Sequence, residues 1–201
     1  MKRHVEQRDF LKFHFLSNPS FSPDASRVAY RVSRPDRERN AYDSDLWVCD
    51  LETGANRRMT ASGREDFYCW SRDGASLIFA SGREDEAGSP KVKRTVFYSI
   101  PLQGGEAVRL FDVPYTAKSV KALDGHRWLL TVVHGPEYEN PEEADFMVFE
   151  QVPFLANGRG YVGQERVGLA LYDAEAGSCR LLTPPLMDVT RCSLNRDRTE
   201  A

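Results

Sequence analysis

A short turn-and-strand motif recurs along this chain at an interval of about fifty residues, and it constrains the fold more than any other feature. Residues 21–30 (FSPDASRVAY) and 70–79 (WSRDGASLIF) share an aromatic residue, a Ser-x-Asp-small turn and an apolar run, 49 residues apart. A weaker copy at 122–130 (ALDGHRWLL) places its aspartate 51 residues further on. Such a period is typical of folds in which each unit covers the apolar face of its neighbour.

A second element recurs in phase with the first. Three strand-like runs end in the glycines Gly54, Gly105 and Gly177, and a short apolar or basic run follows each of them. The steps between these glycines are 51 and 72 residues, so the third unit is the longest. Turn residues between aromatic and β-branched runs predict strands joined by hairpins. Four such strands per unit indicate an antiparallel meander, the blade of a β-propeller.

We therefore predict an all-β chain, a partial β-propeller of four-stranded antiparallel blades, about three blades plus the start of a fourth. Residues 1–17 form an N-terminal segment, and 18–201 form the incomplete propeller domain. The expected blades lie near 18–62, 65–113, 116–185 (with an insertion at 134–166) and, in part, 187–201. Because propellers usually have about four to eight blades, we expect the chain to be truncated relative to its architecture.

Two local features accompany the repeat. Ala25 stands where the second copy has Gly74, so a positive φ at this turn predicts a strain of roughly 1 kcal/mol at the alanine. The pentapeptide SGRED occurs twice, at 62–66 and 81–85. Its spacing of 19 residues is not the blade period, and the sequence assigns it only to loops.

Composition excludes several classes of function. A net charge of −3 gives no general attraction to nucleic acid, and no apolar run approaches the ~20 residues of a membrane helix. The N-terminus lacks the apolar stretch of a signal peptide. The four cysteines are widely spaced without a C-x-x-C motif, which argues against disulfides and a zinc site and favours the reducing cytoplasm.

The repeats resemble the N-terminal β-propeller of the prolyl oligopeptidase family of serine peptidases, in its acylaminoacyl-peptidase/dipeptidyl-peptidase-like branch. The signatures at 18–24 and 45–54 are shared with TolB-type propellers and indicate the fold. Residues 150–161 (EQVPFLANGRGY) resemble the family's E-I-P-F-W-x-N-G-x-G-F stretch, with Leu155 in place of tryptophan and Tyr161 in place of phenylalanine. The resemblance implies a C-terminal α/β-hydrolase domain as partner, which carries the catalytic triad and is absent from this chain.

We expect no catalytic residue within the chain itself. The nearest approach to the nucleophile motif G-x-S-x-G is at Ser76, where Ile78 stands in place of the second glycine. The four histidines have no metal-ligand spacing. Residues 158–163 match G-x-G-x-x-G, but turn residues and a strand surround them instead of a strand and a helix. The sequence thus predicts neither a cofactor nor a metal.

The insertion in the third blade carries the candidate site. Its acidic part has no lysine or arginine, and it is either a solvated loop or a carboxylate arm near the substrate passage. A carboxylate can hold a peptide's ammonium group through a charge-assisted hydrogen bond. The candidate residues for a substrate passage or domain interface are Glu137, Glu139, Glu142, Glu143, Phe154, Asn157 and Tyr161.

Two functions remain open at this stage. The first is a non-catalytic propeller that gates or selects peptide substrates for the hydrolase domain of a full-length serine peptidase. The alternative is a TolB-type or WD-like propeller whose rim recruits a protein. In either case unpaired edges and uncovered blade faces predict that the chain alone is either poorly stable or self-associating, as a homo-oligomer.

Overall fold

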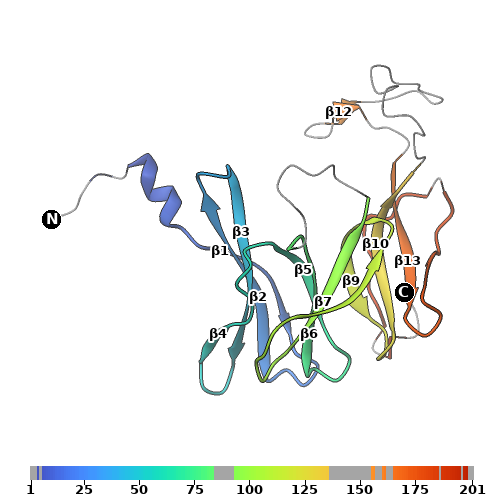
Figure 1. Ribbon diagram of the computed structural model, residues 1–201, viewed down its shortest axis with the longest axis horizontal. Helices are drawn as coiled ribbons and strands as arrows, with labels where there is room; N and C mark the ends of the chain where they lie inside the picture. The colour runs from blue at the N-terminus through green and yellow to red at the C-terminus, as the bar shows by residue number, and fades with distance from the viewer. Residues whose placement is uncertain are drawn as a thin grey trace.

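The computed structural model describes residues 4, 6–83, 93–135, 155–156, 160–161, 165–185, 187–195 and 197–198. These residues form three four-stranded antiparallel sheets and one small two-stranded hairpin (Figure 1). Among them the one helix is a single 3-10 segment, η1 (Gln7–Lys12), which precedes the first strand. The predicted all-β fold class is confirmed.

Each four-stranded sheet is one blade, and its strands follow one another in chain order. Blade one contains β1 (Phe15–Phe21), β2 (Arg27–Asp36), β3 (Ala41–Asp50) and β4 (Asn56–Arg58). Blade two contains β5 (Glu65–Trp70), β6 (Ser76–Ser81), β7 (Thr95–Pro101) and β8 (Val108–Val113). Blade three contains β9 (Thr116–Ala122), β10 (Arg127–His134), β13 (Arg166–Asp173) and β14 (Ser178–Leu181). The insertion between β10 and β13 includes the hairpin of β11 (Leu155–Ala156) and β12 (Gly160–Tyr161).

Blade two lies between the other two blades and has an apolar surface on each side. Because successive side chains of a strand point to opposite faces, Leu77 and Phe79 pack toward blade one while Ile78 and Ala80 pack toward blade three. The core between blades one and two consists of Ala29, Leu46, Val48, Trp70, Leu77, Phe79, Tyr98, Ile100 and Leu102. The core between blades two and three consists of Ile78, Ala80, Phe97, Phe111, Val113, Ala117, Val120, Ala122, Trp128, Leu130, Val132 and Ala170.

The first strands of blades one and two are also joined by hydrogen bonds. The Trp70 indole Nε1 donates to the Ser20 carbonyl at 3.1 Å. The Tyr68 hydroxyl lies 2.6 Å from the carbonyl oxygens of both Asn18 and Ala29. These contacts link polar backbone groups across the junction, so neighbouring blades are fixed by directional bonds as well as by apolar packing.

The outer face of blade one is formed by Phe21, Val28, Tyr30, Trp47 and Cys49, which share one side of the sheet through their pairing register. One repeat later these positions are Trp70, Leu77, Phe79, Tyr98 and Ile100, all buried against blade one. On the outer face of blade one, by contrast, Phe21 is 65% exposed. This face therefore has the residue types of an interface between blades, but its side chains are not buried.

The turn that follows the first strand of a blade repeats its conformation. Ala25 has a φ of 58° and Gly74 a φ of 70°, and both amides donate to the carbonyl three residues earlier. The strain predicted at Ala25 is thus present in the backbone. Arg198 has a φ of 61° and donates in the same way to Asn195. The described residues of 187–198 form no strand, so the start of a fourth blade stays a prediction.

Candidate functional site

The insertion leaves blade three as an arm between β10 and β13. All eight residues of β10 pair with β13, from Arg127↔Asp173 to His134↔Arg166, so the arm begins where this ladder ends. Figure 1 shows the β11–β12 hairpin beyond these strand ends, at the end of the molecule that also carries the β2–β3 turn. We call this the arm end.

Of the seven candidate residues, the structure describes only the backbone of Tyr161. It lies in β12 and pairs with Leu155. The other six lie outside the described residues, namely Glu137, Glu139, Glu142, Glu143, Phe154 and Asn157. Their role in a substrate passage or an interface therefore stays a prediction.

The base of the arm is closely packed. A Cβ atom on Gly168 would lie 2.5 Å from Thr183 Oγ1 and 2.7 Å from His134 Nε2, so any larger residue here would force these two side chains to move. The Val167 amide donates to Asp188 Oδ1 at 2.8 Å, and the Val189 amide donates to the Val167 carbonyl at 2.7 Å. The chain on the C-terminal side of β14 therefore returns to hold the first residues of β13 in place.

An ion pair joins this base to the neighbouring blade. Lys93 Nζ, just before β7 of blade two, lies 3.4 Å from a carboxylate oxygen of Glu165, just before β13. Both side chains are about half exposed, so the pair contributes little to stability. It does show that the start of β7 and the base of the arm lie side by side.

Two buried carboxylates, Asp45 and Glu65, lie on the arm-end side of the junction between blades one and two. Asp45 is 4% exposed and accepts hydrogen bonds from Arg58 Nη2 at 2.6 Å and from the Gly63 amide at 3.2 Å. Glu65 is 2% exposed and accepts from Arg83 Nη2 at 2.7 Å. Each buried charge is therefore matched by an arginine, as burial requires.

Arg83 is itself held by aromatic rings. Its guanidinium carbon lies 4.4 Å from the ring centroid of Tyr98 and 5.2 Å from that of Phe79. A cation above an aromatic face gains electrostatic energy from the ring quadrupole. The Glu65–Arg83 ion pair therefore packs against Phe79 and Tyr98, two aromatic residues of the core between blades one and two.

Each partner of this ion pair comes from one copy of the SGRED pentapeptide, Glu65 from the first and Arg83 from the second. Their described residues run antiparallel, with Glu65 opposite Ser81 in the β5–β6 ladder. The Arg64 side chain donates to the Gly82 carbonyl at 3.1 Å, while the Gly82 amide donates to the Arg64 carbonyl at 3.2 Å. The sequence showed the identical segments but not their pairing, because 19 residues does not match the blade period.

These charged groups stabilise the fold. Asp45 and Glu65 are already bonded to arginines, so neither is free to receive an ammonium group. Within the described residues, no group of three His, Cys, Asp or Glu side chains is placed to hold a metal ion. No helix in this part of the chain is long and apolar enough to cross a membrane.

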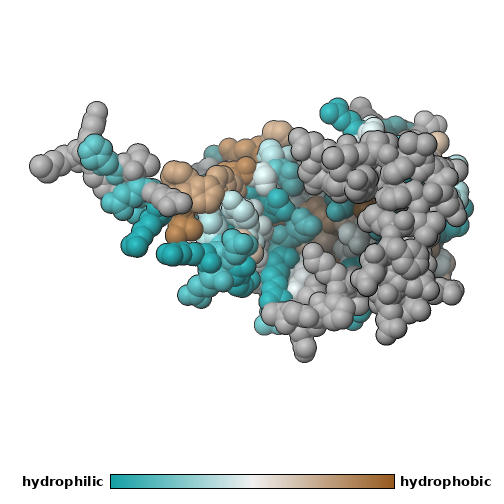
Figure 2. Space-filling view, turned by 90° about the horizontal axis from the view of Figure 1, so that it is seen from above, coloured by the Kyte–Doolittle hydropathy of each residue, from teal (hydrophilic) through white to brown (hydrophobic). Residues whose placement is uncertain are grey.

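An aromatic cluster stands exposed at the arm end of blade one. It consists of Phe10, Phe13, Phe15 and Tyr42, which are 45%, 52%, 38% and 55% exposed. The rings contact one another, with centroids 5.6 Å apart for Phe10 and Phe15 and 6.1 Å apart for Phe15 and Tyr42. Figure 2, which looks down on this end, shows hydrophobic surface between the N-terminal segment and blade one. Contiguous exposed apolar surface of this kind marks an interaction site.

A comparison with known protein sequences identifies a peptidase relative. The chain is 28% identical over 192 residues to the uncharacterized peptidase YuxL of Bacillus subtilis (strain 168). The match covers 91% of this chain and 28% of the relative, so the chain spans little more than a quarter of that protein's length. No family model matches the chain.

Solved structures of peptidases share the fold. An acylaminoacyl peptidase in complex with Z-Gly-Gly-Phe-chloromethyl ketone aligns with a TM-score of 0.63 and 20% identity, over 86% of this chain and 25% of that one. Pyrococcus horikoshii acylaminoacyl peptidase aligns with a TM-score of 0.64 and 21% identity, over 85% of this chain and 25% of that one. At these identities the likeness shows the β-propeller fold. Together with the sequence relative, it confirms the predicted resemblance to peptidase propellers.

Proposed function

We propose that this chain is the non-catalytic propeller part of a serine peptidase, where it selects or gates peptides for a separate α/β-hydrolase domain. The aromatic cluster at the arm end is the observation that carries the proposal. Its four side chains are 38–55% exposed, although each has the residue type of a buried contact. A second domain that covers them would remove this apolar surface from water.

The β11–β12 hairpin of the arm lies at the same end of the molecule as the β2–β3 turn, beside which Tyr42 of the aromatic cluster lies (Figure 1). A hydrolase domain docked on the cluster would therefore face the arm, and the arm would border the route by which a peptide reaches the catalytic residues. Loops on a rigid scaffold commonly supply specificity in this way. The β10–β13 ladder supplies that scaffold, since it is paired up to the residue where the arm begins.

The thiols favour a reducing compartment for this protein, and we propose the cytoplasm. All four cysteines, Cys49, Cys69, Cys179 and Cys192, are free. Burial raises the pKa of the Cys69 thiol to about 12 and that of Cys179 to about 11, so these two are unreactive.

A chimera tests the proposed function. This chain replaces the aligned segment of the Bacillus subtilis relative, and a second chimera carries a short Gly-Ser bridge in place of residues 136–164. We expect the arm deletion to change the ratio of kcat/KM between long and short peptides by at least about tenfold, which corresponds to ~1.4 kcal/mol in relative transition-state binding. Hydrolysis of a small ester should remain unchanged, because it needs no peptide selection.

The controls separate folding from selection. Ester hydrolysis by both chimeras shows that the hydrolase domain is intact, and a fluorophosphonate probe should label each chimera but not the isolated chain. Unchanged kinetics on every peptide length would reduce the arm to a passive loop and contradict selection. Labelling of a serine in the isolated chain would contradict a non-catalytic role. Should the chimera with the unmodified arm lack ester activity, limited proteolysis of the two chimeras reports whether the aromatic cluster docks.

A further inference from the structure

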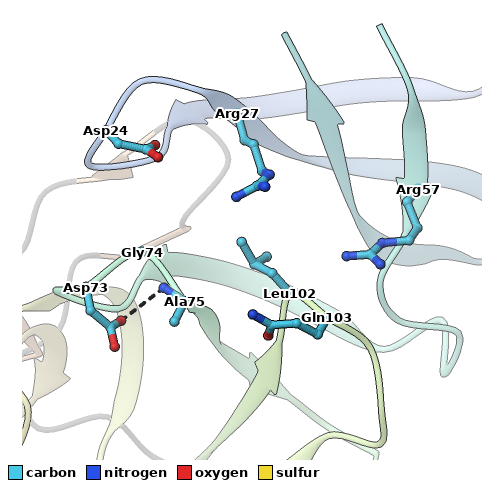
Figure 3. A pocket seen from close by; sticks show the side chains of 8 residues that line it. All are labelled: Asp24, Arg27, Arg57, Asp73, Gly74, Ala75, Leu102 and Gln103. Atoms are coloured by element: carbon cyan, nitrogen blue, oxygen red, sulfur yellow. Dashed lines mark hydrogen bonds between the residues drawn. The ribbon is translucent and has the colours of Figure 1, made fainter. Parts of the chain in front are cut away.

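A cavity of about 430 Å³ opens between blades one and two at the end opposite the arm (Figure 3). It lies between the β1–β2 turn, the β5–β6 turn and the outer strand of blade one. Its lining residues are Asp24, Arg27, Arg57, Asp73, Gly74, Ala75, Leu102 and Gln103. The lining thus contains two arginines, two aspartates and the apolar side chain of Leu102.

Strand alternation places both arginines on the same side of blade one. Arg27 lies two residues before Ala29, and Arg57 pairs with Val48. Ala29 and Val48 are buried in the core that faces blade two, so both arginines lie on this same face of blade one. They lie at the edge of that core, next to its buried residue Leu102 from blade two. In Figure 3 both guanidinium groups point toward the space beside Leu102.

Arg27 has one long ion pair, with Asp50, and Arg57 has no anionic partner among the described residues. Arg27 Nε lies 3.7 Å from Asp50 Oδ2, which is longer than a hydrogen bond. Among the residues that the structure describes, Arg57 has neither a hydrogen bond nor an ion pair. Two like charges directed at one cavity favour the entry of an anion. A carboxylate suits them, because a guanidinium can donate two parallel hydrogen bonds to its oxygens.

The two aspartates are committed to their own turns. Asp24 Oδ1 accepts from the Ser26 amide at 3.0 Å, and Asp73 Oδ1 accepts from the Ala75 amide at 3.0 Å. Hydrogen bonds from serine hydroxyls hold the pKa of both carboxyl groups below the usual range, so both carry a negative charge. They line the other side of the cavity in Figure 3, so the lining as a whole carries no net charge and an anion is favoured only beside the two arginines.

We propose that this cavity binds the carboxylate group of a peptide, with Arg27 and Arg57 donating hydrogen bonds to its oxygens and Leu102 contacting the adjacent apolar side chain. The carboxylate belongs either to the C-terminus of the peptide or to an acidic side chain. The site lies away from the arm and does not depend on a hydrolase domain, so it stands or falls separately from the proposed function.

Saturation-transfer NMR on the whole chain tests the proposal, since it works for monomers and assemblies alike. The probes are N-acetyl-Gly-Leu with a free C-terminus, N-acetyl-Gly-Leu amide, and N-acetyl-Asp-Leu amide. We expect transfer to the first or third probe and none to the second. Transfer to the free C-terminus alone identifies the chain terminus as the ligand, and transfer to the aspartyl amide identifies an acidic side chain.

Matched arginine variants locate the binding. Arg57→Gln and Arg27→Gln should each raise Kd for the carboxylate probe about tenfold, the loss expected for one charge-assisted bond. Arg37→Gln, an exposed position in the turn between β2 and β3 at the arm end, should leave Kd unchanged. Equal transfer to acid and amide peptides, equal affinity of the Arg57 and Arg37 variants, or no transfer to any probe at millimolar concentration would overturn the proposal.

Discussion

A single methyl group sets the backbone strain at the turn between β1 and β2. Ala25 has a φ of 58°, a region that costs a non-glycine residue about 1–2 kcal/mol. Glycine relieves this cost but loses more backbone entropy on folding, about 0.5–1 kcal/mol. We therefore expect Ala25→Gly to raise the free energy of unfolding by up to about 1 kcal/mol, measured by urea denaturation.

The second copy of the turn supplies the matched control. Gly74 has a φ of 70°, and a Cβ atom there would lie 3.0 Å from Pro23 Cδ. Gly74→Ala should therefore lower the free energy of unfolding by about 1–2 kcal/mol. The two variants must move stability in opposite directions, and a shift of the same sign would contradict the shared turn conformation.

The Asp24 carboxyl should titrate at a lower pH than an ordinary aspartate. A hydrogen bond from the Ser22 hydroxyl, with others from Ser26, lowers the pKa of the Asp24 carboxyl from 3.8 to about 2. Because the folded pKa lies below the unfolded one, the ionised carboxylate favours the folded state. That contribution is complete above pH ~4 and is lost as the pH falls through about 2.

NMR-detected titration of the carboxyl groups checks this directly. The Asp24 midpoint should lie near pH 2, and Ser22→Ala should move it upward because the hydroxyl that lowers this pKa most is removed. An Asp24 midpoint near 3.8 in the unmodified chain would contradict the turn geometry.

The positive φ of Ala25 could be predicted by comparing the two copies of the turn, because they align residue by residue and the second copy has glycine at this position. The Glu65–Arg83 pair could not be predicted in this way. Its partners lie at the start of β5 and just after β6, in segments whose spacing is unrelated to the repeat. An ion pair between them depends on where the folded chain brings them together. The candidate carboxylates of the arm stay predictions for a related reason, since no repeat copy indicates their conformation.

The β5–β6 ladder depends on the Glu65–Arg83 pair at its arm-end limit. The Glu65 side chain is fully buried and that of Arg83 is 24% exposed. We expect Arg83→Gln to lower the free energy of unfolding by about 2–4 kcal/mol, because it leaves a buried carboxylate without its cation. Urea denaturation of the purified variant measures this loss.

An exposed ion pair in the same blade is the control for this variant. Arg109 and Asp112, both in strand β8, form an ion pair and are 44% and 40% exposed. Arg109→Gln should cost no more than about 1 kcal/mol. Losses of equal size for the two arginine variants would mean that burial does not set the energy of the Glu65–Arg83 pair.

The strands were predictable because turn residues interrupt aromatic and β-branched runs at regular intervals. The structure of the N-terminal segment was harder to predict from the sequence. Its phenylalanines fit neither the helical nor the strand period, and the structure resolves this by forming a 3-10 segment at 7–12 and an exposed cluster of rings. The pattern failed there because the apolar residues are not directed into the core of a blade.

The repeat period predicts blades, but not what covers the outer face of blade one. Phe21, Tyr30 and Trp47 occupy positions that are buried one repeat later, yet Phe21 is 65% exposed. Apolar burial drives association whenever a complementary face is available. We therefore expect the isolated chain to self-associate through this face.

Sedimentation velocity over a range of concentrations tests this most directly. The unmodified chain should sediment above the value for a 22.8 kDa monomer as its concentration rises. Phe21→Ser should restore the monomer, whereas Val108→Ser, at a 67% exposed position on the edge strand of blade two, should not. A single monomeric species at every concentration, with cooperative unfolding, would contradict the account of blade one as a face that requires a cover.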